Sequence, residues 1–438
     1  MEITKLSVGG FKNLTYTELN LDNIAAIVSP NNYGKSNLLE ALSFATNFIS
    51  ASSKVRKAMM SSVKGIPITK SLENNQFKFE IEFFDDELGE YSYVRYGYSF
   101  LWYRDDNSGA KIIDEWLEMH SKDNKRYTSY LKRDEGRYRK GISTTAFRKL
   151  LFDDSQLAID ILASVNDLEY AEVIQKIQKF EYRICSSLDL QGRFLSSPIE
   201  MIGTQTDSIK FDDEDVPRAL YCLKQKYPEK YQLFKESIFN LFPEFIDFDV
   251  QVYEPKKDNL HLVVANVTDS TESKDPEVPF YIRDELYRLI IKSETLNQPI
   301  NISMMSTGTK RIFWLLANVF ISSCANVSCI GIEELETSIH PKMLKNLLEI
   351  LNEALGKTKL IISSHSPYLI QYLKLNQIFI GVPSNTGVAK FKKIMPSKSK
   401  QLLSISSDYG MTFGEYLFEL LSGNEMSYEI VRRFLEDN

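Results

Sequence analysis

The sequence is poor in the residues that build disulfide frameworks and metal centres. It has four cysteines and four histidines among 438 residues, and no two cysteines form a CxxC pair. Disulfide scaffolds and zinc sites require denser sets of these residues at short spacings. We therefore expect neither kind of site, and the composition fits a protein of the reducing cytoplasm.

The sequence also lacks an excess of positive charge. Its 52 Lys and Arg residues are outnumbered by 59 Asp and Glu residues, which gives a net charge of −7. No bulk positive field therefore draws the chain onto nucleic acid or anionic membranes. Two groups of basic residues could still form a local basic face, although we favour ordinary solvated surface. They are Lys54, Arg56, Lys57 and Lys64, and Arg126, Lys132, Arg133, Arg137, Arg139 and Lys140. A nucleic-acid partner stays open but is not indicated by the net charge.

Only one uncharged stretch has the length of a membrane span. Residues 312–332 carry no charge over 21 positions, which is enough to cross a bilayer. The stretch contains three serines and two asparagines, and it divides naturally into a helix followed by a strand. A buried helix that leads into a central strand explains this apolarity better. The N-terminal residues alternate and are polar, unlike a signal peptide, so we expect no membrane association.

Short apolar strands alternate with amphipathic helices, without an internal repeat, a low-complexity tract or a long heptad pattern. The predicted strands are 2–8, 21–28, 77–84, 91–103, 248–253, 260–267, 328–332 and 359–363. Helices are predicted from about Lys35 and over 147–188, 218–242, 309–321 and 341–355, with a turn at 85–90 and a loop at 269–279. The alternation near both ends predicts a parallel sheet flanked by helices. Strands 77–84 and 91–103, joined by the turn, predict an antiparallel pair.

One loop has the composition of a phosphate-binding loop. The segment Ser29-Pro-Asn-Asn-Tyr-Gly-Lys-Ser36 lies between a predicted strand and a predicted helix. It matches GxxxxGK[ST] except that Ser29 replaces the first glycine. In such a loop the backbone N–H groups surround a phosphate, Lys35 reaches the β- and γ-phosphates, and the Ser36 hydroxyl holds Mg²⁺. Ser29 would strain the first turn if that turn needs the positive φ that glycine tolerates. A turn that contains Gly-Lys-Ser by chance is the weaker alternative.

Two adjacent carboxylates, Glu333 and Glu334, follow the predicted strand 328–332. Hydrolysis of Mg-ATP needs one carboxylate that holds the metal, directly or through water, and another that polarises the attacking water. We assign Glu333 to the metal and Glu334 to the water. A solvated acidic turn is the alternative.

A histidine and a serine–glycine pair complete the candidate residues. His365 follows the predicted strand 359–363, from where it could reach a γ-phosphate, although a lone histidine is more often structural. Ser306 and Gly308 directly precede a predicted helix. The N-terminus of a helix binds anions, but capping by serine is the default explanation of such a position. The assignment of these residues to a nucleotide site therefore rests on their order along the chain.

Read together, these motifs resemble the ABC/SMC/RecF-like ATPase superfamily, and more narrowly the ATPase half of OLD (overcoming lysogenization defect) proteins. The family order is a phosphate loop, a long insertion, an SxG signature, an acidic strand with a following His-Pro, and Ser-His-Ser-Pro. This chain has these motifs in the same order, at Asn31–Asn37, Ser306–Gly308, Glu333–Glu334 with His340-Pro341, and Ser364–Pro367. The opening Phe11-Lys-Asn-Leu14 also fits the family.

The resemblance implies a slow ATP hydrolase that uses Mg²⁺ and works as a homodimer or higher homo-oligomer. Nucleotide would be held by Asn31, Asn32, Tyr33, Gly34, Lys35, Ser36 and Asn37, with Ser36 and Glu333 at the metal and Glu334 and His365 in catalysis. Ser306 and Gly308 would contact ATP that is bound by the facing chain. The chain departs from the family at Ser29, at Glu333, where aspartate is usual, and in lacking a recognisable Q-loop glutamine. These departures bear on the turnover rate more than on binding.

The resemblance also bears on the biological role. OLD nucleases carry a TOPRIM nuclease domain after the histidine motif, but only 73 residues (438 − 365) follow His365, and they contain no DxD. The chain thus resembles an OLD ATPase without its own nuclease. Such ATPases commonly serve in bacterial anti-phage defence modules of the PARIS, Septu or retron type, beside a separate effector such as a TOPRIM or HNH nuclease. The alternatives are a RecF/SMC-like DNA-repair ATPase that grips DNA itself and an inactive nucleotide-binding structural protein.

The expected fold is α/β: an ABC-type ATPase head with a mixed central sheet flanked by helices, an antiparallel β subdomain and a helical insertion. We expect an N-terminal ATPase lobe with the phosphate loop at 1–145 and a mainly helical insertion at 146–245. A C-terminal ATPase lobe with the remaining motifs is expected at 246–385, followed by a C-terminal extension at 386–438.

Overall fold

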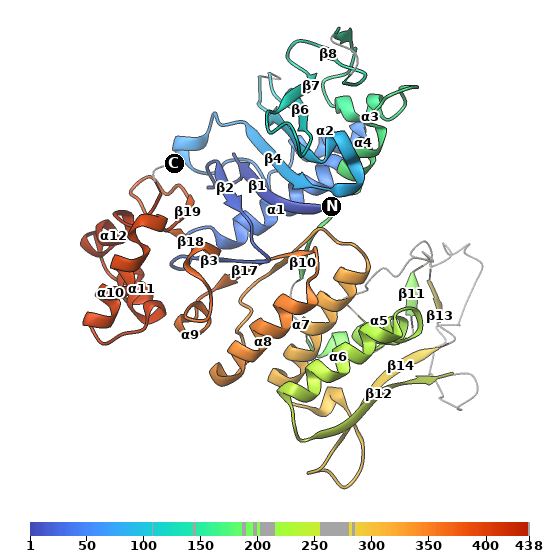
Figure 1. Cartoon of the computed structure of the whole chain (residues 1–438), viewed down its shortest axis with the longest axis vertical. Helices are drawn as coiled ribbons and strands as arrows, with labels where there is room; N and C mark the ends of the chain where they lie inside the picture. The colour runs from blue at the N-terminus through green and yellow to red at the C-terminus, as the bar shows by residue number, and fades with distance from the viewer. Residues whose placement is uncertain are drawn as a thin grey trace, which may run out of the picture. The chain divides into compact units, whose positions relative to one another are not determined.

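A computed structural model describes residues 1–106, 108–142, 146–185, 190–195, 199–201, 215–254, 280–282 and 285–436 (Figure 1). The predicted strand 260–267 and the predicted loop 269–279 lie outside these residues.

The chain forms two compact units that do not follow the predicted domain boundaries. Unit 1 consists of residues 1–186, 326–336 and 355–438, and unit 2 consists of residues 187–325 and 337–354. The predicted C-terminal extension, 386–438, therefore belongs to the same unit as the N-terminus. The predicted insertion, 146–245, is divided between the two units.

The central sheet of unit 1 has the strand order β10-β16-β17-β3-β18-β19. These strands are β10 Tyr182–Cys185, β16 Cys329–Ile332, β17 Lys359–Ser364, β3 Ile24–Val28, β18 Ile378–Gly381 and β19 Phe391–Lys393. The first five run parallel, and only β19 is antiparallel to its neighbour. Every residue of β3, β16 and β17 is buried, as expected for strands that are covered on both faces. The parallel core predicted from the sequence is confirmed.

The prediction of a continuous helical block over 147–188 is wrong. The described part of this segment contains β9 Arg148–Lys149, the short helices α3 Ala158–Leu162 and α4 Ala171–Gln178, and the edge strand β10. β10 pairs with β16, and the Tyr182 ring lies directly over Gly331, where an added Cβ would come within 2.1 Å of the tyrosine Oη. Pairing with a strand about 150 residues away thus outweighs the local helical pattern.

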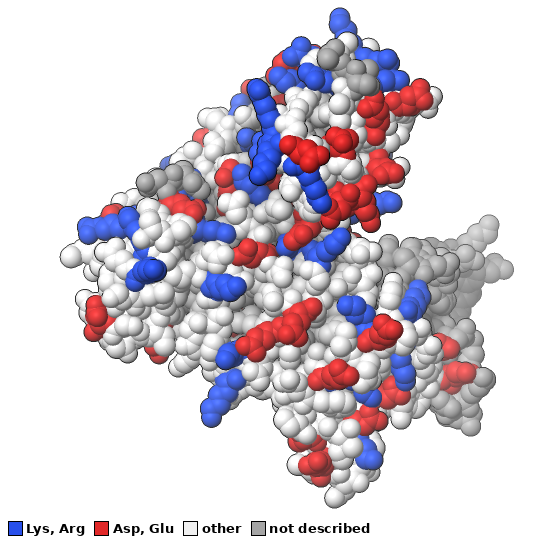
Figure 2. Space-filling view, in the orientation of Figure 1, with Lys and Arg blue, Asp and Glu red and all other residues white. Residues whose placement is uncertain are grey.

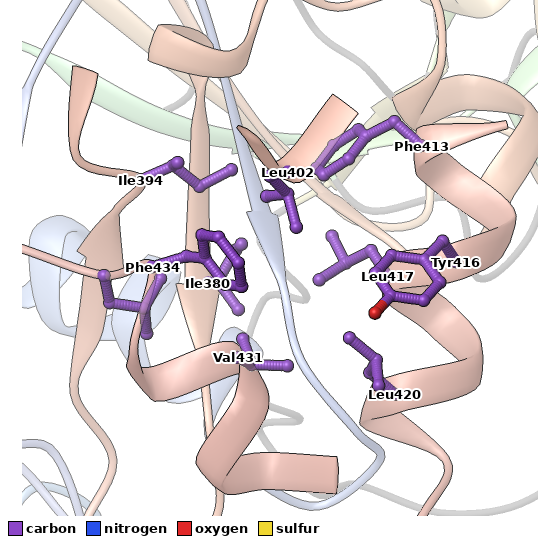
Figure 3. A pocket seen from close by; sticks show the side chains of 10 residues that line it. Ile380, Ile394, Leu402, Phe413, Tyr416, Leu417, Leu420, Val431 and Phe434 are labelled. Carbon is purple, nitrogen blue, oxygen red and sulfur yellow. The ribbon is translucent and has the colours of Figure 1, made fainter. Parts of the chain in front are cut away.

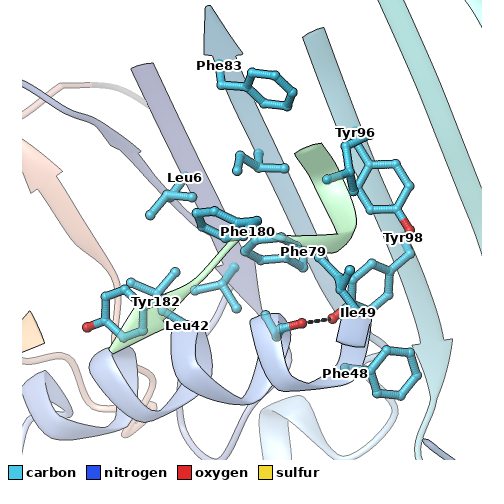
Figure 4. Packing of buried hydrophobic residues seen from close by; sticks show 14 of the residues in the cluster. Leu6, Leu42, Phe48, Ile49, Phe79, Phe83, Tyr96, Tyr98, Phe180 and Tyr182 are labelled. Atoms are coloured by element: carbon cyan, nitrogen blue, oxygen red, sulfur yellow. Dashed lines mark hydrogen bonds between the residues drawn. The ribbon is translucent and has the colours of Figure 1, made fainter. Parts of the chain in front are cut away.

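An antiparallel sheet of order β2-β1-β4-β5-β6-β7-β8-β9 forms the second layer of unit 1. Its strands before β9 are β1 Glu2–Gly9, β2 Thr17–Asn20, β4 Phe77–Phe84, β5 Tyr93–Leu101, β6 Lys111–His120, β7 Thr128–Lys132 and β8 Arg137–Tyr138. The predicted antiparallel pair is therefore confirmed as β4 and β5. Figure 4 shows side chains of these strands meeting helix α1, Lys35–Ser50, in a common core, where the Tyr98 hydroxyl donates to the Ala45 carbonyl at 2.8 Å.

The remaining helices of unit 1 are α2 Ser53–Met60, α9 Pro367–Ile370, α10 Ser399–Asp408, α11 Phe413–Leu421 and α12 Glu425–Arg432, with 3-10 turns η1 Lys70–Leu72, η2 Asp86–Tyr91, η5 Leu375–Gln377 and η6 Pro396–Lys398. Helices α10 to α12 bring apolar side chains together with Ile380 of β18 (Figure 3). The space left between these side chains is about 10 Å³, which is room for about one water. The cluster is therefore the core of the C-terminal extension.

Unit 2 packs helices against a small antiparallel sheet. Its helices are α5 Val216–Lys226, α6 Pro228–Leu241, α7 Thr307–Cys324 and α8 Pro341–Ala354, its 3-10 turns are η3 Gly192–Phe194 and η4 Ile302–Met304, and its strands are β11 Ile199–Met201, β12 Phe245–Tyr253, β13 Phe280–Ile282, β14 Leu286–Ser293 and β15 Ile300–Asn301. Among the residues that the structure describes, β12 forms an antiparallel pair with β14. Phe313 of α7 packs against Phe234 and Phe248, with ring centroids 6.0 and 5.2 Å apart. Among the described residues, no helix combines the length and the apolarity that crossing a membrane requires.

A buried carboxylate fixes α3 to the antiparallel sheet. Glu115 of β6 is fully buried and accepts hydrogen bonds from the backbone N–H groups of Ala158 and Ile159 at 2.5 and 3.1 Å. The Tyr96 hydroxyl donates to it at 3.1 Å, and the Arg133 guanidinium lies 3.7 Å away. Burial nevertheless raises the pKa of Glu115 to about 7. The carboxylate depends on these partners because water does not reach it.

Replacing Glu115 by Ala should therefore destabilise the protein strongly. The change leaves the Arg133 cation and two helical N–H groups buried without this acceptor, so we expect a loss of about 3–5 kcal/mol in the free energy of unfolding. Glu135, an ion-pair partner of Lys132 at the surface, provides the control, and Glu135→Ala should cost about 1 kcal/mol or less. Denaturant unfolding measures both, and similar losses for the two variants would contradict the assigned role.

Candidate nucleotide-binding site

Parallel pairing brings three predicted motifs to one edge of the central sheet of unit 1. Strand β3 ends at the phosphate loop, β16 ends at the acidic pair and β17 ends at the Ser-His-Ser-Pro motif. Val28 pairs with Ser364, and Ile332 pairs with Ile362. Since the carboxyl ends of parallel strands lie at the same edge, this register places the three motifs side by side.

The phosphate loop has the strand–loop–helix setting expected from the sequence. Gly34 caps α1 with a φ of 132°, and an added Cβ would lie 2.9 Å from both the Asn13 side chain and the Ala389 Cβ. This position therefore requires glycine both for its backbone angle and for its close contacts. Ser29 is buried and does not have a positive φ. The strain that a serine could cause here is thus absent, because the turn does not need a left-handed residue.

Lys35 folds back onto its own loop. Its ammonium donates to the carbonyls of Ser29 and Pro30 at 2.9 and 3.1 Å. The side chain is buried. Burial lowers the pKa of Lys35 to about 8, against the opposing effect of Glu334 and Glu336. Phosphate oxygens would replace these two carbonyls as partners of the cation.

Residues outside the motif hold the loop in place. The Asn13 side chain donates to the Tyr33 carbonyl at 2.8 Å and accepts from the Asn37 amide at 2.8 Å. The Tyr33 hydroxyl donates to the Lys390 carbonyl and accepts from the Lys390 N–H, both at 3.0 Å. The ring of Tyr33 packs on Gly381, where an added Cβ would lie 2.2 Å from it. The opening motif Phe11–Leu14 pointed to Asn13, but no sequence pattern pointed to Lys390 or Gly381.

The acidic pair lies on a tight turn directly after β16. Glu334 has a φ of 45°, and its N–H donates to the Ser363 hydroxyl at 3.2 Å. This left-handed conformation is uncommon for a residue other than glycine, and such strain tends to occur at functional sites. The hydrogen bond fixes the turn to the end of β17. Glu334 is exposed and Glu333 is half-buried.

His365 is half-buried, in the electrostatic field of the other two motifs. Burial lowers its pKa, Lys35 lowers it further, and Glu334 acts in the opposite direction. Burial and the Lys35 charge thus favour the neutral form of the imidazole. These mutual effects agree with the strand register in bringing Lys35, Glu334 and His365 into one neighbourhood.

The described residues contain no group of three or more His, Cys, Asp or Glu side chains that could hold a metal ion alone. The donors that the sequence assigns to Mg²⁺ are different: the exposed Ser36 hydroxyl in the first turn of α1 and the Glu333 carboxylate after β16. Mg²⁺ is commonly bound by few protein oxygens together with waters and substrate phosphates. The donor set therefore fits Mg²⁺ that arrives with a nucleotide.

The signature residues belong to unit 2. Ser306 is the N-cap of α7, and its hydroxyl accepts from the Thr309 N–H at 3.1 Å. Gly308 passes so close to the Ser338 carbonyl that an added Cβ would lie 2.5 Å from it. The capping role is therefore present, and Gly308 is needed for packing within the unit. Their contact with a nucleotide on another chain stays a prediction.

Sequence reasoning missed Glu336. Its carboxylate accepts from the Ser364 hydroxyl at 3.0 Å and from the His365 N–H at 2.7 Å. Burial raises its pKa. The available signal was the spacing Glu-Glu-Leu-Glu after β16, in which the third acid lies two residues beyond Glu334.

Comparison with known proteins identifies the family and the fold of the chain. The model of the family described as "AAA domain, putative AbiEii toxin, Type IV TA system" matches residues 24–371. A solved Smc head bound to the C-winged helix domain of ScpA is 15% identical and covers 92% of this chain and 100% of its own, with a TM-score of 0.50. The Smc head domain with a coiled coil and joint from Pyrococcus yayanosii is 10% identical over 93% of this chain and 99% of its own, with a TM-score of 0.47. No curated protein sequence matches the chain. The first structural likeness shows the fold, which is that of an SMC/ABC ATPase head.

Replacing Lys35 by Ala should weaken nucleotide binding. The loop would lose its cation and its bonds to two carbonyls, and a charge-assisted hydrogen bond is worth about 1.5–3 kcal/mol. We expect the Kd of a fluorescent ATP analogue to rise about 30-fold or more. Lys57→Ala, on the exposed face of α2, should leave the Kd unchanged. A Kd that is unchanged in Lys35→Ala, with unfolding also unchanged, would contradict the phosphate-loop assignment.

Proposed function

The chain belongs to this AAA-domain family, and on that premise we propose that it is a Mg-ATP hydrolase of the ABC type whose site is completed by a second copy of the chain. The observation that carries the proposal is the meeting of three strand ends at one sheet edge. They supply a buried lysine, an acidic pair and a histidine, which are groups that can bind and hydrolyse a phosphate anhydride.

Each residue has a role that follows from its chemistry. The backbone N–H groups of the loop and the Lys35 ammonium bind the β- and γ-phosphates. When bound by Ser36 and Glu333, Mg²⁺ supplies positive charge that stabilises the phosphate oxygens. Glu334 accepts the proton of the attacking water. His365, being neutral, donates a hydrogen bond from its ring N–H to the γ-phosphate.

A second copy supplies the remaining contact. Ser306 is exposed at the N-terminus of α7. A helix N-terminus favours a phosphate. The exposure of this helix end supports its contact with a nucleotide that is bound by a second chain.

The structure weakens the alternative of a DNA-gripping ATPase. Several of the basic residues that could have formed a basic face have acidic partners instead: Arg56 with Asp160, Arg133 with Glu115, Lys132 and Arg137 with Glu135, and Lys140 with Asp167. Acidic side chains also lie among basic ones on the face shown in Figure 2. Paired cations release fewer counterions when they meet phosphates. We therefore favour a protein partner over nucleic acid.

The partner that we propose is a separate effector nuclease, within a bacterial anti-phage defence system. The family description names a toxin–antitoxin system, which supports a role beside a second protein. The ATPase would then act as the sensor or regulatory subunit. Co-expression with the neighbouring gene, followed by isolation of a stable complex, tests this role.

Glu334→Gln should remove the water-polarising carboxylate and preserve its size. We expect ATP hydrolysis to fall by about 10²-fold or more, in line with the loss of a general base, while ATP stays bound and the dimer accumulates. Steady-state phosphate release and gel filtration with ATP measure the two effects. Glu349→Gln, at an exposed position of α8, serves as the control. Unchanged hydrolysis in Glu334→Gln would exclude this residue as the base.

Mixing two inactive variants tests the shared site. Ser306→Arg blocks the facing surface but leaves the phosphate loop intact, and Lys35→Ala damages the loop but leaves the signature intact. A mixed dimer has one site with both parts intact, so hydrolysis in an equimolar mixture should rise well above the mean of the two variants. Strict averaging, with subunit exchange verified by mass-tagged protomers, would show that each chain builds its whole site alone.

A further inference from the structure

The turn that carries His365 is held by a carboxylate to which no role has been assigned. One oxygen of Glu336 accepts from the Ser364 hydroxyl at 3.0 Å and from the His365 N–H at 2.7 Å. The Ser364 hydroxyl also accepts from the Ser366 N–H at 3.0 Å. The side chains of Glu336 and Ser364 therefore fix the backbone N–H groups of His365 and Ser366.

These bonds are strong because of where they lie. Ser364 is fully buried, and a hydrogen bond in the low-dielectric interior of a protein is electrostatically stronger than one in water. Glu336 comes from the loop after β16, while its donors come from the end of β17. The contact thus ties the acidic loop to the histidine loop.

The position of Glu336 carries an energetic cost that packing alone does not explain. Its second oxygen, Oε2, is buried and has no hydrogen-bond partner among the described residues. A buried carboxylate oxygen without a partner is unfavourable, and an apolar residue could fill the same space more cheaply. Glu336 also acts electrostatically on Lys35, so its charge faces the phosphate loop as well. Such an energetic cost is expected where a buried charge contributes to the function of a site.

We propose that Glu336 is a positioning residue of the hydrolytic site, which sets the His365 imidazole toward the γ-phosphate by fixing the backbone on which it stands. The inference rests on the proposed ATP hydrolysis. Glu336 touches neither substrate nor water in this role, and it acts through His365.

The first test measures the hydrogen bond between the His365 N–H and Glu336 directly, in the absence of nucleotide. The chain has four histidines, His120, His261, His340 and His365, so labelling with ¹⁵N-histidine gives few backbone amide signals, and His365→Ala identifies the one of interest. A short bond to a carboxylate shifts an amide proton downfield. In Glu336→Ala this signal should move upfield by several tenths of a ppm or more. In Glu336→Gln, whose amide oxygen still accepts, it should move less.

The second test reads the function. A misplaced catalytic group can cost about 10²-fold in rate, so Glu336→Ala should lower kcat about 10- to 100-fold while KM changes less than about threefold. Glu336→Gln should retain more activity than Glu336→Ala. If Glu336 acts through His365, the double variant with His365→Ala should be no slower than His365→Ala alone. Glu353→Ala, at an exposed position of α8, is the control.

The outcomes separate the two proposals. An unchanged His365 signal in both Glu336 variants overturns the positioning contact, whether or not the protein hydrolyses ATP. A shifted signal with unchanged kcat, or multiplicative effects of the two substitutions, overturns the positioning role. A wild-type protein that binds ATP without hydrolysing it refutes the proposed function, and the positioning role with it, while the shifted signal would still show the contact.

Discussion

The parallel pairing of β3, β16 and β17 is the constraint on which the site depends. These strands come from residues 24–28, 329–332 and 359–364, so the chain closes a loop of about 300 residues to assemble them. This pairing places the residues that follow each of the three strands at the same edge of the sheet. A shift of one residue along β17 would turn its side chains to the opposite face and part Ser363 from the Glu334 N–H. Burial of the three strands on both faces stabilises the register.

Charged side chains lie at that edge of the sheet, although burial disfavours their charged forms. Burial lowers the pKa of Lys35 and raises that of Glu336, so each group is less stable in its charged form than in water. Backbone carbonyls offset the first cost, and the Ser364 hydroxyl and the His365 N–H offset the second. The offset is incomplete, as the buried Oε2 atom shows.

The sequence was sufficient to predict local structure where a pattern is confined to a short stretch of the chain. The loop around Lys35, the acidic pair and the strand before His365 could be predicted because each is a local pattern next to an apolar strand. The strand at Tyr182–Cys185 could not, because its conformation depends on pairing with β16 and on space over Gly331. The role of Glu336 could not be predicted from the sequence, for a related reason. An acid in a polar turn looks solvated until the fold buries it against the histidine loop. The buried position of Lys35 likewise follows from tertiary contacts.

The loop after β16 also links the site to the signature motif along the chain. Glu336 ends a segment of unit 1 and holds His365, whereas Ser338, two residues later, belongs to unit 2 and packs its carbonyl against Gly308. A single residue, Thr337, lies between Glu336, which holds the His365 backbone, and Ser338, which packs against Gly308. The same short turn therefore carries a close contact within unit 1 and a close contact within unit 2.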